Sequence, residues 1–278
     1  MRRQSPATAR HPTAAGALYR FAPAGADVAI EIDLARLRDN AALGPLVAAA
    51  AEAGFSAGGL DARIAEDLDV VLLCAYGVGS AQAATLTLMR GPHAAAVPGA
   101  TPVARDVFGL GPPALIARAQ AAFSPAGEAS GRDGEPTLAD DAHFSEIRDA
   151  AMPDAATGAV LRVTAVLDFD ARVALAGKLA LDTVPRAVSV WGDVADDLAA
   201  VAVLVAENPA EAAQLALLVE RARNELATGA AVRLLGIAAA IHQARISARG
   251  SATTAILVIP PSLLSQVVAR AKLALVAL

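Results

Sequence analysis

The chain is predicted to have an α+β fold, because its hydrophobic segments occur in a characteristic order. Short stretches in which apolar and polar residues alternate, as expected for strands, are mostly grouped in pairs around turns, with single helical stretches between the groups. Neighbouring strand pairs favour antiparallel sheets, whereas strict alternation of strand and helix would favour a parallel sheet. We therefore expect antiparallel sheet structure with helices packed mainly on one face.

The composition is apolar without being typical of a membrane protein. Hydrophobic residues make up 55% of the 278 positions, but only 3% of positions are aromatic and about a quarter are alanine, which buries little area. Residues 70–89 and 250–269 lack charge over a bilayer-spanning length, but the first contains a glycine-rich turn and the second contains Pro260-Pro261. We therefore expect no membrane span. The net charge of −5, without basic stretches, excludes nucleic acid as a partner.

The first half of the chain begins with an alternating strand over residues 27–33. Aliphatic residues at positions 28, 30 and 32 alternate with Ala29, Glu31 and Asp33, a pattern typical of a strand whose polar side faces water. The segments predicted to follow are a helix over 34–53, broken near Gly44-Pro45, a hairpin of 69–78 and 83–90, a strand over 103–108 and a helix over 114–122.

The second half repeats this order of elements. Its predicted segments are a strand over 160–168, a helix over 170–181, a hairpin of 186–194 and 198–207, helices over 210–227 and 230–240, a hairpin of 241–249 and 252–259, and a helix over 262–276. In both halves two prolines lead from a strand into a helix, at Pro112-Pro113 and Pro260-Pro261. The matched order predicts two related strand-helix-hairpin-strand-helix repeats, and it leaves open whether they share one sheet.

These patterns divide the chain into four parts. Residues 1–24 are expected to be a disordered leader, and residues 25–123 the first, shortened repeat. Residues 124–142 are rich in glycine, serine, proline and acid, which is typical of a flexible linker. Residues 143–278 form the second repeat.

No sequence motif assigns a catalytic residue or a cofactor. The G-x-G patterns at Gly77 and Gly109 do not complete a dinucleotide-binding fingerprint, and neither lysine lies in a phosphate-binding loop. Cys74 is the single cysteine, which excludes an internal disulfide, and its apolar neighbours indicate a buried, inert thiol. Trp191, the single tryptophan, is expected to be a core residue.

One cluster of polar side chains could hold a metal ion. Asp140, Asp141, His143 and Glu146 lie within seven residues, and His143 and Glu146 would share one face of a helix. The competing interpretation is a helix start, at which an aspartate caps the first turn and the imidazole is solvated. A metal-dependent hydrolase that uses this cluster is the alternative function that the sequence supports.

Residues 18–38 resemble the start of uncharacterised bacterial envelope proteins, which are similar to secreted lipoproteins of unknown function. The shared patterns are P-x-x-A-x-V at Pro23–Val28, which opens a strand, and D-L-x-x-L at Asp33–Leu37, which opens a helix; residues 188–197 are similar to the same group. The sequence as written lacks a signal peptide and a lipidated cysteine. It therefore implies the cytoplasm as it stands, and the periplasm or cell envelope if the true start lies upstream.

Together these observations favour a non-enzymatic binding or assembly protein. Its expected partner is another protein or a small apolar ligand, because no sequence motif assigns a cofactor, a metal or a catalytic residue. The resemblance adds an association with the envelope to this expectation.

Overall fold

Ten strands of the computed structural model belong to one antiparallel sheet. The structure describes residues 16–45, 47–48, 56–57, 60–61, 68–122, 135–154, 156 and 158–276. The first half of the chain supplies β1 (Val28–Asp33), β4 (Val70–Tyr76), β5 (Ala84–Arg90), β6 (Thr101–Ala104) and β7 (Val107–Leu110). The second half supplies β8 (Leu161–Val166), β9 (Ala187–Val194), β10 (Leu198–Val205), β11 (Arg245–Arg249) and β12 (Ala252–Ile259). Two short strands, β2 (Ser56–Ala57) and β3 (Leu60–Asp61), pair separately.

Eight α-helices accompany the sheet in the described part of the chain. They are α1 (Leu34–Asp39), α4 (Pro113–Ala122), α5 (Ala142–Asp149), α6 (Phe169–Leu179), α7 (Pro209–Thr228), α8 (Ala230–Leu235), α9 (Ala238–His242) and α10 (Pro261–Val276). Two short 3₁₀ helices, η1 (Ala17–Arg20) and η2 (Ala94–Ala96), complete the set. The α+β class expected from the sequence is therefore confirmed.

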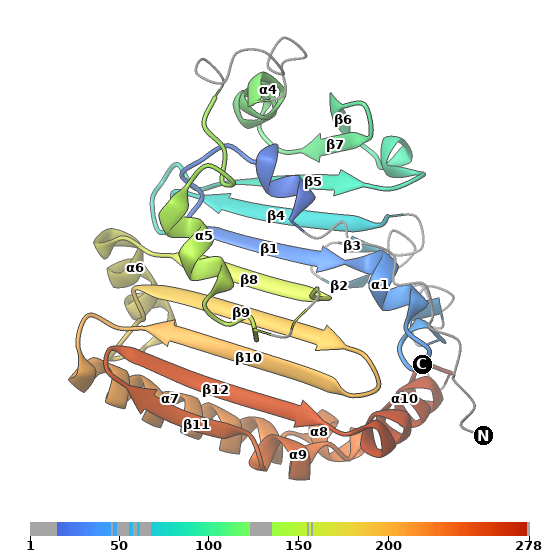
Figure 1. Cartoon of the computed structure of the whole chain (residues 1–278), viewed down its shortest axis with the longest axis vertical. Helices are drawn as coiled ribbons and strands as arrows, with labels where there is room; N and C mark the ends of the chain where they lie inside the picture. Colours follow the sequence, from blue (N-terminus) through green and yellow to red (C-terminus); the bar gives the residue numbers. More distant parts are fainter. Residues whose placement is uncertain are drawn as a thin grey trace.

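The predicted arrangement of two repeats with helices mainly on one face is wrong. The strand order is β11-β12-β10-β9-β8-β1-β4-β5-β7-β6, so strands from both halves form one continuous sheet (Figure 1). The halves join where β1 pairs with β8, with Ile30 opposite Val163. The physical reason is that separate sheets would leave the backbone N–H and C=O groups of these two strands unpaired at an edge, and their pairing satisfies both.

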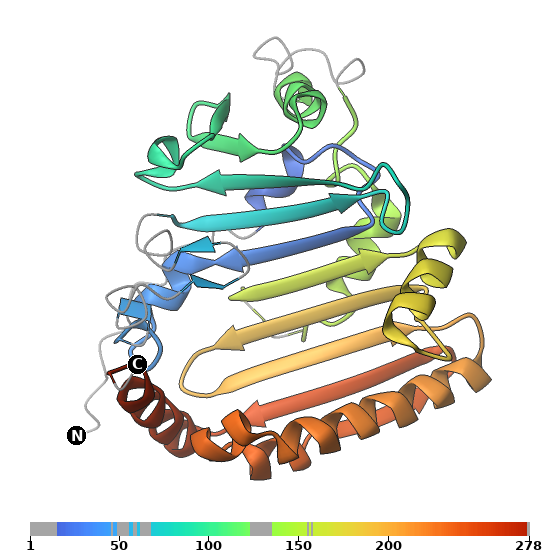
Figure 2. The same cartoon turned by 180° about the vertical axis from the view of Figure 1, so that it is seen from behind.

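Helices lie on both faces of the sheet. Figure 1 shows η1 and α5 in front of the central strands, and Figure 2, from behind, shows α6 and α7 in front. We call the side that carries η1 and α5 the front face, and the side that carries α6 and α7 the back face. The front face holds the largest buried cluster, in which Leu18, Tyr19 and Phe144 pack on Leu72 and Leu88.

Several local signals in the sequence are confirmed. Asn208 caps α7, its side-chain oxygen accepting a hydrogen bond from the Glu211 N–H at 3.0 Å, and Pro209 occupies the first turn. The expected hairpin of residues 69–78 and 83–90 is β4–β5, with Leu72 opposite Leu88. Among the described residues, none of the helices combines the length and the apolar character that crossing a membrane requires.

Other local expectations need correction. Residues 103–108 were expected to be one strand, but Arg105 and Asp106 form a turn between β6 and β7. Residues 16–24, part of the expected leader, contain η1 and pack against the front face. Of the expected linker, residues 124–134 lie outside the described residues, as do residues 1–15 of the leader.

Candidate functional site

Strand β1 has its polar side buried and its aliphatic side partly exposed. On the front face, Glu31 is 2% exposed and accepts a hydrogen bond from the Gly16 N–H beside η1, and Asp33 is 3% exposed and caps α1. On the back face, Val28, Ile30 and Ile32 are only half-buried. The expectation that the polar side of this strand faces water is therefore wrong. Folding chains normally bury the aliphatic side of an amphipathic strand, so this inversion needs an explanation.

The neighbouring central strands show the same inversion. On β8, Thr164 is fully buried on the front face while Val163 is half-buried on the back. On β9, Ser189 is buried on the front face while Val190 is half-buried on the back. At the centre of three adjacent strands, polar side chains are therefore buried on the front face and aliphatic side chains are half-buried on the back face, although β9 also buries Ala187 and Trp191 on the front.

The half-buried aliphatic residues form a row across the back face. Residues directly opposite one another in six neighbouring strands make up this apolar row, which consists of Leu73, Ile30, Val163, Val190, Ala202 and Ala255. All six are half-buried. Figure 2 shows the middle of β1, β8, β9 and β10 with no helix in front of it. At about 4.8 Å per strand spacing, the row is roughly 24 Å long.

Packed clusters border the apolar row on three sides. At one end of the strands α6 covers Val28, Ala165 and Val188 through its Ala171. At the opposite end Val194, Leu198 and Ile259 pack with residues of α1 and α10. At the same end as α6, α7 covers Leu204 of β10. At the β4 end of the row, Leu73 itself packs against the cluster of Leu68, Val71, Met89 and Ala94. The row is thus a less covered strip of the sheet between packed regions, and its aliphatic side chains carry no hydrogen-bonding or charged group.

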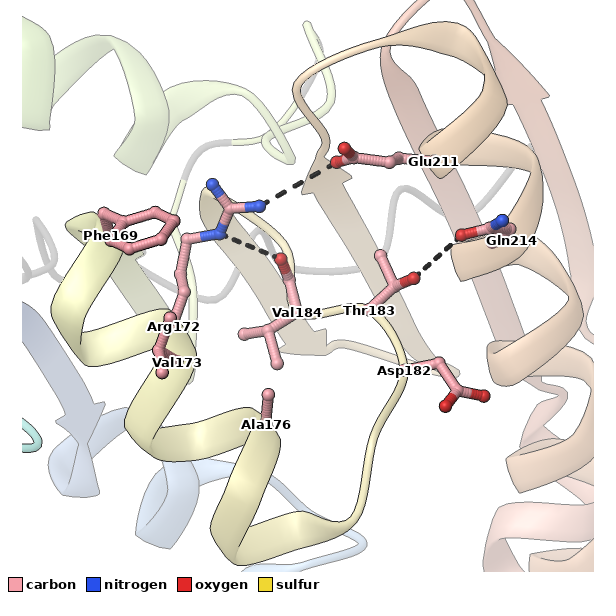
Figure 3. A pocket seen from close by; sticks show the side chains of 9 residues that line it. All are labelled: Phe169, Arg172, Val173, Ala176, Asp182, Thr183, Val184, Glu211 and Gln214. Atoms are coloured by element: carbon pink, nitrogen blue, oxygen red, sulfur yellow. Dashed lines mark hydrogen bonds and ion pairs between the residues drawn. The ribbon is translucent and has the colours of Figure 1, made fainter.

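A groove of about 270 Å³ lies between α6 and α7 (Figure 3). Its lining is Phe169, Arg172, Val173, Ala176, Asp182, Thr183, Val184, Glu211 and Gln214. Phe169 and Val173 are 74% and 56% exposed on α6. Val188, packed under α6, lies opposite Leu204, packed under α7, and this covered pair separates the groove from Val190 and Ala202 of the row.

The polar side chains of this groove are mostly engaged with one another. The Arg172 guanidinium donates to the Val184 carbonyl at 3.1 Å and pairs with Glu207 at 2.5 Å, while Glu211 lies at 3.8 Å. The Thr183 hydroxyl donates to the Gln214 side chain at 2.9 Å. Asp182, by contrast, is exposed and makes no hydrogen bond or ion pair with the described residues.

A second polar cluster is buried on the front face beneath η1 and α5. Its members are Tyr19, Glu31, Arg148, Arg162 and Thr164. Four buried atoms in it lack a hydrogen-bond partner: the Tyr19 hydroxyl, Glu31 Oε2, Arg162 Nε and Thr164 Oγ1. Arg162 lies opposite Glu31 in the sheet, and the Arg148 guanidinium lies 5.2 Å from the centre of the Tyr19 ring. Buried atoms of this kind are usually satisfied by internal water.

The electrostatics of the front cluster oppose charge on its acids. Burial raises the pKa of Glu31, and the hydrogen bond that its Oε1 accepts from the Gly16 N–H at 2.5 Å only partly offsets this effect. Burial likewise raises the pKa of Tyr19, so its phenol stays protonated. One hydrogen bond, from the Gly16 N–H at the start of η1 to Glu31 Oε1, therefore joins this segment to the sheet.

The residues proposed as metal ligands are not brought together as a ligand set. Asp140 accepts hydrogen bonds from the Thr137 N–H and hydroxyl at 3.0 and 2.7 Å, and Asp141 caps α5 as expected. His143 and Glu146 are exposed on α5. The described residues contain no group of three or more His, Cys, Asp or Glu that could hold a metal ion. The geometry therefore gives no support to the hydrolase alternative.

The single cysteine and the single tryptophan lie where the sequence places them. Cys74 is 1% exposed, and burial raises the pKa of its thiol to about 12, so the thiol is inert at neutral pH. Trp191 is 7% exposed on the front face and its indole N–H donates to the Gly158 carbonyl at 2.9 Å. Both therefore belong to the interior and not to a site.

Sequence patterns found part of the candidate site and missed the rest. Ile30, Val163 and Val190 belong to predicted strands, but a period of two cannot tell which face the rest of the chain covers. The α6–α7 groove joins residues that are 42 positions apart in sequence at Arg172 and Gln214, and no local motif links them. An aromatic residue at the start of a helix, Phe169, was the one available signal.

Comparisons with known proteins do not assign a family. No protein-family model and no curated protein matches the chain. Among solved structures, the chain is similar to crystal form I of TP0453, at 10% sequence identity and a TM-score of 0.39, over 91% of this chain and 96% of that one. A likeness this low carries no argument about family or function, so the resemblance to envelope proteins stays a prediction.

Proposed function

We propose that this chain is a non-enzymatic binding protein that holds an elongated apolar ligand along the apolar row of its back face. The observation that carries the proposal is the inverted burial of β1, β8 and β9, in which Glu31, Thr164 and Ser189 are buried while Ile30, Val163 and Val190 are partly exposed. Burying polar groups costs free energy, and so does leaving aliphatic ones in water. A ligand that covers the row recovers the second of these costs.

The chemistry of the row favours a hydrocarbon chain. The backbone groups of the central strands are paired within the sheet, so the face offers side chains only and no free N–H or C=O for a peptide strand. The six side chains are aliphatic, with the small Ala202 and Ala255 at one end. An aliphatic ligand about as long as the row, roughly 24 Å at 4.8 Å per strand, needs no hydrogen bonds and matches this surface.

A neutral fluorescent probe tests this proposal directly. N-phenyl-1-naphthylamine brightens when it enters an apolar site, and we expect it to bind the full chain and to be displaced by the neutral long-chain alcohol dodecanol. Val190→Asp places a carboxylate in the middle of the row and should weaken dodecanol binding at least about tenfold, since a charge cannot be buried unpaired beneath an alkyl chain.

The matched control is Val258→Asp on β12. Val258 is 47% exposed, and it points to the front face, because its partner Ala199 packs in the cluster of Trp191. This variant introduces the same charge at another exposed valine and should leave binding unchanged. Absence of probe binding would show that the back face is not the ligand site. An equal loss of dodecanol affinity in both variants, with folding shown to be intact by circular dichroism, would show the same.

A further inference from the structure

We propose that the outer edge of β11 binds an extended acidic segment of a partner protein, which adds a further strand to the sheet. The inference goes beyond the proposed function and does not depend on it, because it concerns the edge of the sheet and not the apolar row. Figure 1 shows β11 as the outermost strand at one end of the sheet, with α7 behind it.

The backbone groups of β11 point alternately toward β12 and away from the sheet, as in any antiparallel strand. The Ala206 N–H donates to the Ser251 carbonyl at 2.8 Å, so Ser251 and every second residue after it direct their backbone groups toward β10. The β12 residues between them therefore bond to β11, where they lie opposite Arg245, Ser247 and Arg249.

The two intervening residues of β11, Ile246 and Ala248, are thus left with their N–H and C=O groups directed outward. These groups make no hydrogen bond with the described residues. The neighbouring outward carbonyl, at Ala244, accepts a hydrogen bond from the Arg223 side chain of α7 at 3.3 Å. Four backbone groups are therefore open to an added strand, which is how extended peptides join the edge of a sheet.

The opposite edge of the sheet is protected against such pairing. Its strand, β6, contains Pro102, which has no N–H to donate. The Pro102 carbonyl accepts a hydrogen bond from the Gln120 side chain at 2.7 Å. Strand β11 contains no proline, and its Ala248 is exposed. Of the two edges, β11 is therefore the one that suits a partner strand.

Two arginines on the front face of β11 select an acidic partner. Arg245 and Arg249 are exposed, and neither makes an ion pair with the described residues. Their neighbours on β12, Ile256 and Ala252, are apolar. An added antiparallel strand places two of its own residues, four positions apart on one face, opposite these arginines. The two strands exchange no backbone bonds at these positions, so the facing side chains approach closely and carboxylates pair favourably.

The same charges disfavour a second copy of this chain at the edge. Antiparallel pairing of two β11 strands about Ser247 places Arg245 of each copy opposite Arg249 of the other. Like charges directly opposite one another destabilise a strand pair. The charge pattern therefore favours a partner of different sequence, with acidic residues in place of the arginines.

The test compares two heptapeptides that carry a neutral coumarin label, TEVTVET and TKVTVKT, by fluorescence anisotropy with the full chain. In the first peptide the second and sixth residues are glutamates that lie opposite the two arginines, and in the second peptide they are lysines. We expect the acidic peptide to bind at least about tenfold more tightly at low ionic strength. The difference should shrink as salt is raised, because the charges are exposed.

Variants assign the binding to this edge. The double variant Arg245→Glu/Arg249→Glu should reverse the preference between the two peptides. Ala248→Pro removes one outward N–H but no bond to β12, and should weaken binding of TEVTVET at least about tenfold. The matched control is Arg105→Glu, which reverses an exposed arginine in the turn at the opposite edge and should leave binding unchanged.

Hydrogen exchange measured by NMR locates the peptide on the strand. In the free chain the Ser247 amide, which bonds to β12, should exchange slowly, whereas the amides of Ile246 and Ala248 should exchange fast. Saturating TEVTVET should slow exchange at Ile246 and Ala248 and leave Ser247 unchanged.

The outcomes decide between recognition and simple protection, since charged side chains at an edge also serve to block association. Absence of peptide binding would show that the arginines only protect the edge, and would overturn the inference. Equal affinity for both peptides, or an equal loss in Arg105→Glu, would overturn it as well. None of these measurements involves the apolar row, so their failure leaves the proposed function standing, and failure of dodecanol binding leaves this inference standing.

Discussion

Two neighbouring leucines on β4 offer a sharp test of the unequal cover on the two faces of the sheet. Leu72 points to the front face and is 0% exposed, packed in the cluster beneath η1 and α5. Leu73 points to the back face, lies at one end of the apolar row and is half-buried. Replacing each by alanine removes the same atoms from adjacent positions of one strand, so the difference between the variants reports the cover on each face.

The expected magnitudes follow from burial. Leu72→Ala removes a fully enclosed side chain and leaves a cavity, which should lower the free energy of unfolding by about 3–5 kcal/mol. Leu73→Ala removes a partly exposed side chain that packs against the cluster of Leu68, Val71, Met89 and Ala94, so only part of the transfer free energy is lost, about 1–1.5 kcal/mol. The first variant should therefore be less stable than the second by at least about 2 kcal/mol.

Urea unfolding followed by circular dichroism measures both values, and saturating dodecanol adds a second comparison. Since a ligand that binds only the folded state stabilises it, dodecanol should raise the midpoint of the wild type and of Leu72→Ala, and should raise that of Leu73→Ala less. Equal destabilisation by the two substitutions in the absence of ligand would show that the back face is as well covered in solution as the front. That result would refute the argument from inverted burial.

Four further outcomes are expected. Burial raises the pKa of Glu31 above 4.5, so the stability that this acid contributes is present at low pH and is lost as the pH rises from 4.5 through the pKa of the folded state. Glu31→Gln does not titrate, so its melting temperature should rise relative to that of the wild type over the same pH range. The Cys74 thiol, with a pKa raised to about 12, should react with Ellman's reagent at pH 8 only after unfolding in guanidinium. Asp193→Ala removes the paired contacts that Arg36 of α1 makes with β9, at 2.8 and 2.6 Å between nitrogen and oxygen atoms, and should cost about 1.5–3 kcal/mol in urea titrations. Trp191 fluorescence should resist acrylamide quenching and should not shift when dodecanol binds, because the indole is buried on the front face; a shift on binding would place the ligand there.

The sequence predicted most local structure correctly, because local structure has local causes. The period-two alternation in residues 27–33 corresponds to β1, and the Asn208-Pro209 pair begins α7 as expected. Pairs of prolines likewise mark the starts of α4 and α10, whose first residues are Pro113 and Pro261. The turn at Arg105 and Asp106 was missed because it contains neither glycine nor proline.

The assembly of these elements was not predictable in the same way. The joining of β1 to β8 links residues that are 129 to 137 positions apart in the sequence. It is decided by which unpaired strand edges meet, and no residue gives a local signal for that. The division into repeats followed from the order of the elements, and order along the chain says nothing about which strands become neighbours. The groove between α6 and α7 depends on the same long-range packing.

The sequence by itself determined that β1 has an aliphatic side and a polar side, that helices begin at capping residues, and that Cys74 and Trp191 belong to apolar surroundings. Only the tertiary structure decided which side of β1 is covered. The segments that contain η1 and α5 come from distant parts of the chain and pack together on the front face, the face of Glu31. On the back face, the packed clusters lie on either side of Ile30. The physical reason is that alternation fixes two faces through backbone geometry, but the cover on each face depends on the packing free energy of the whole chain.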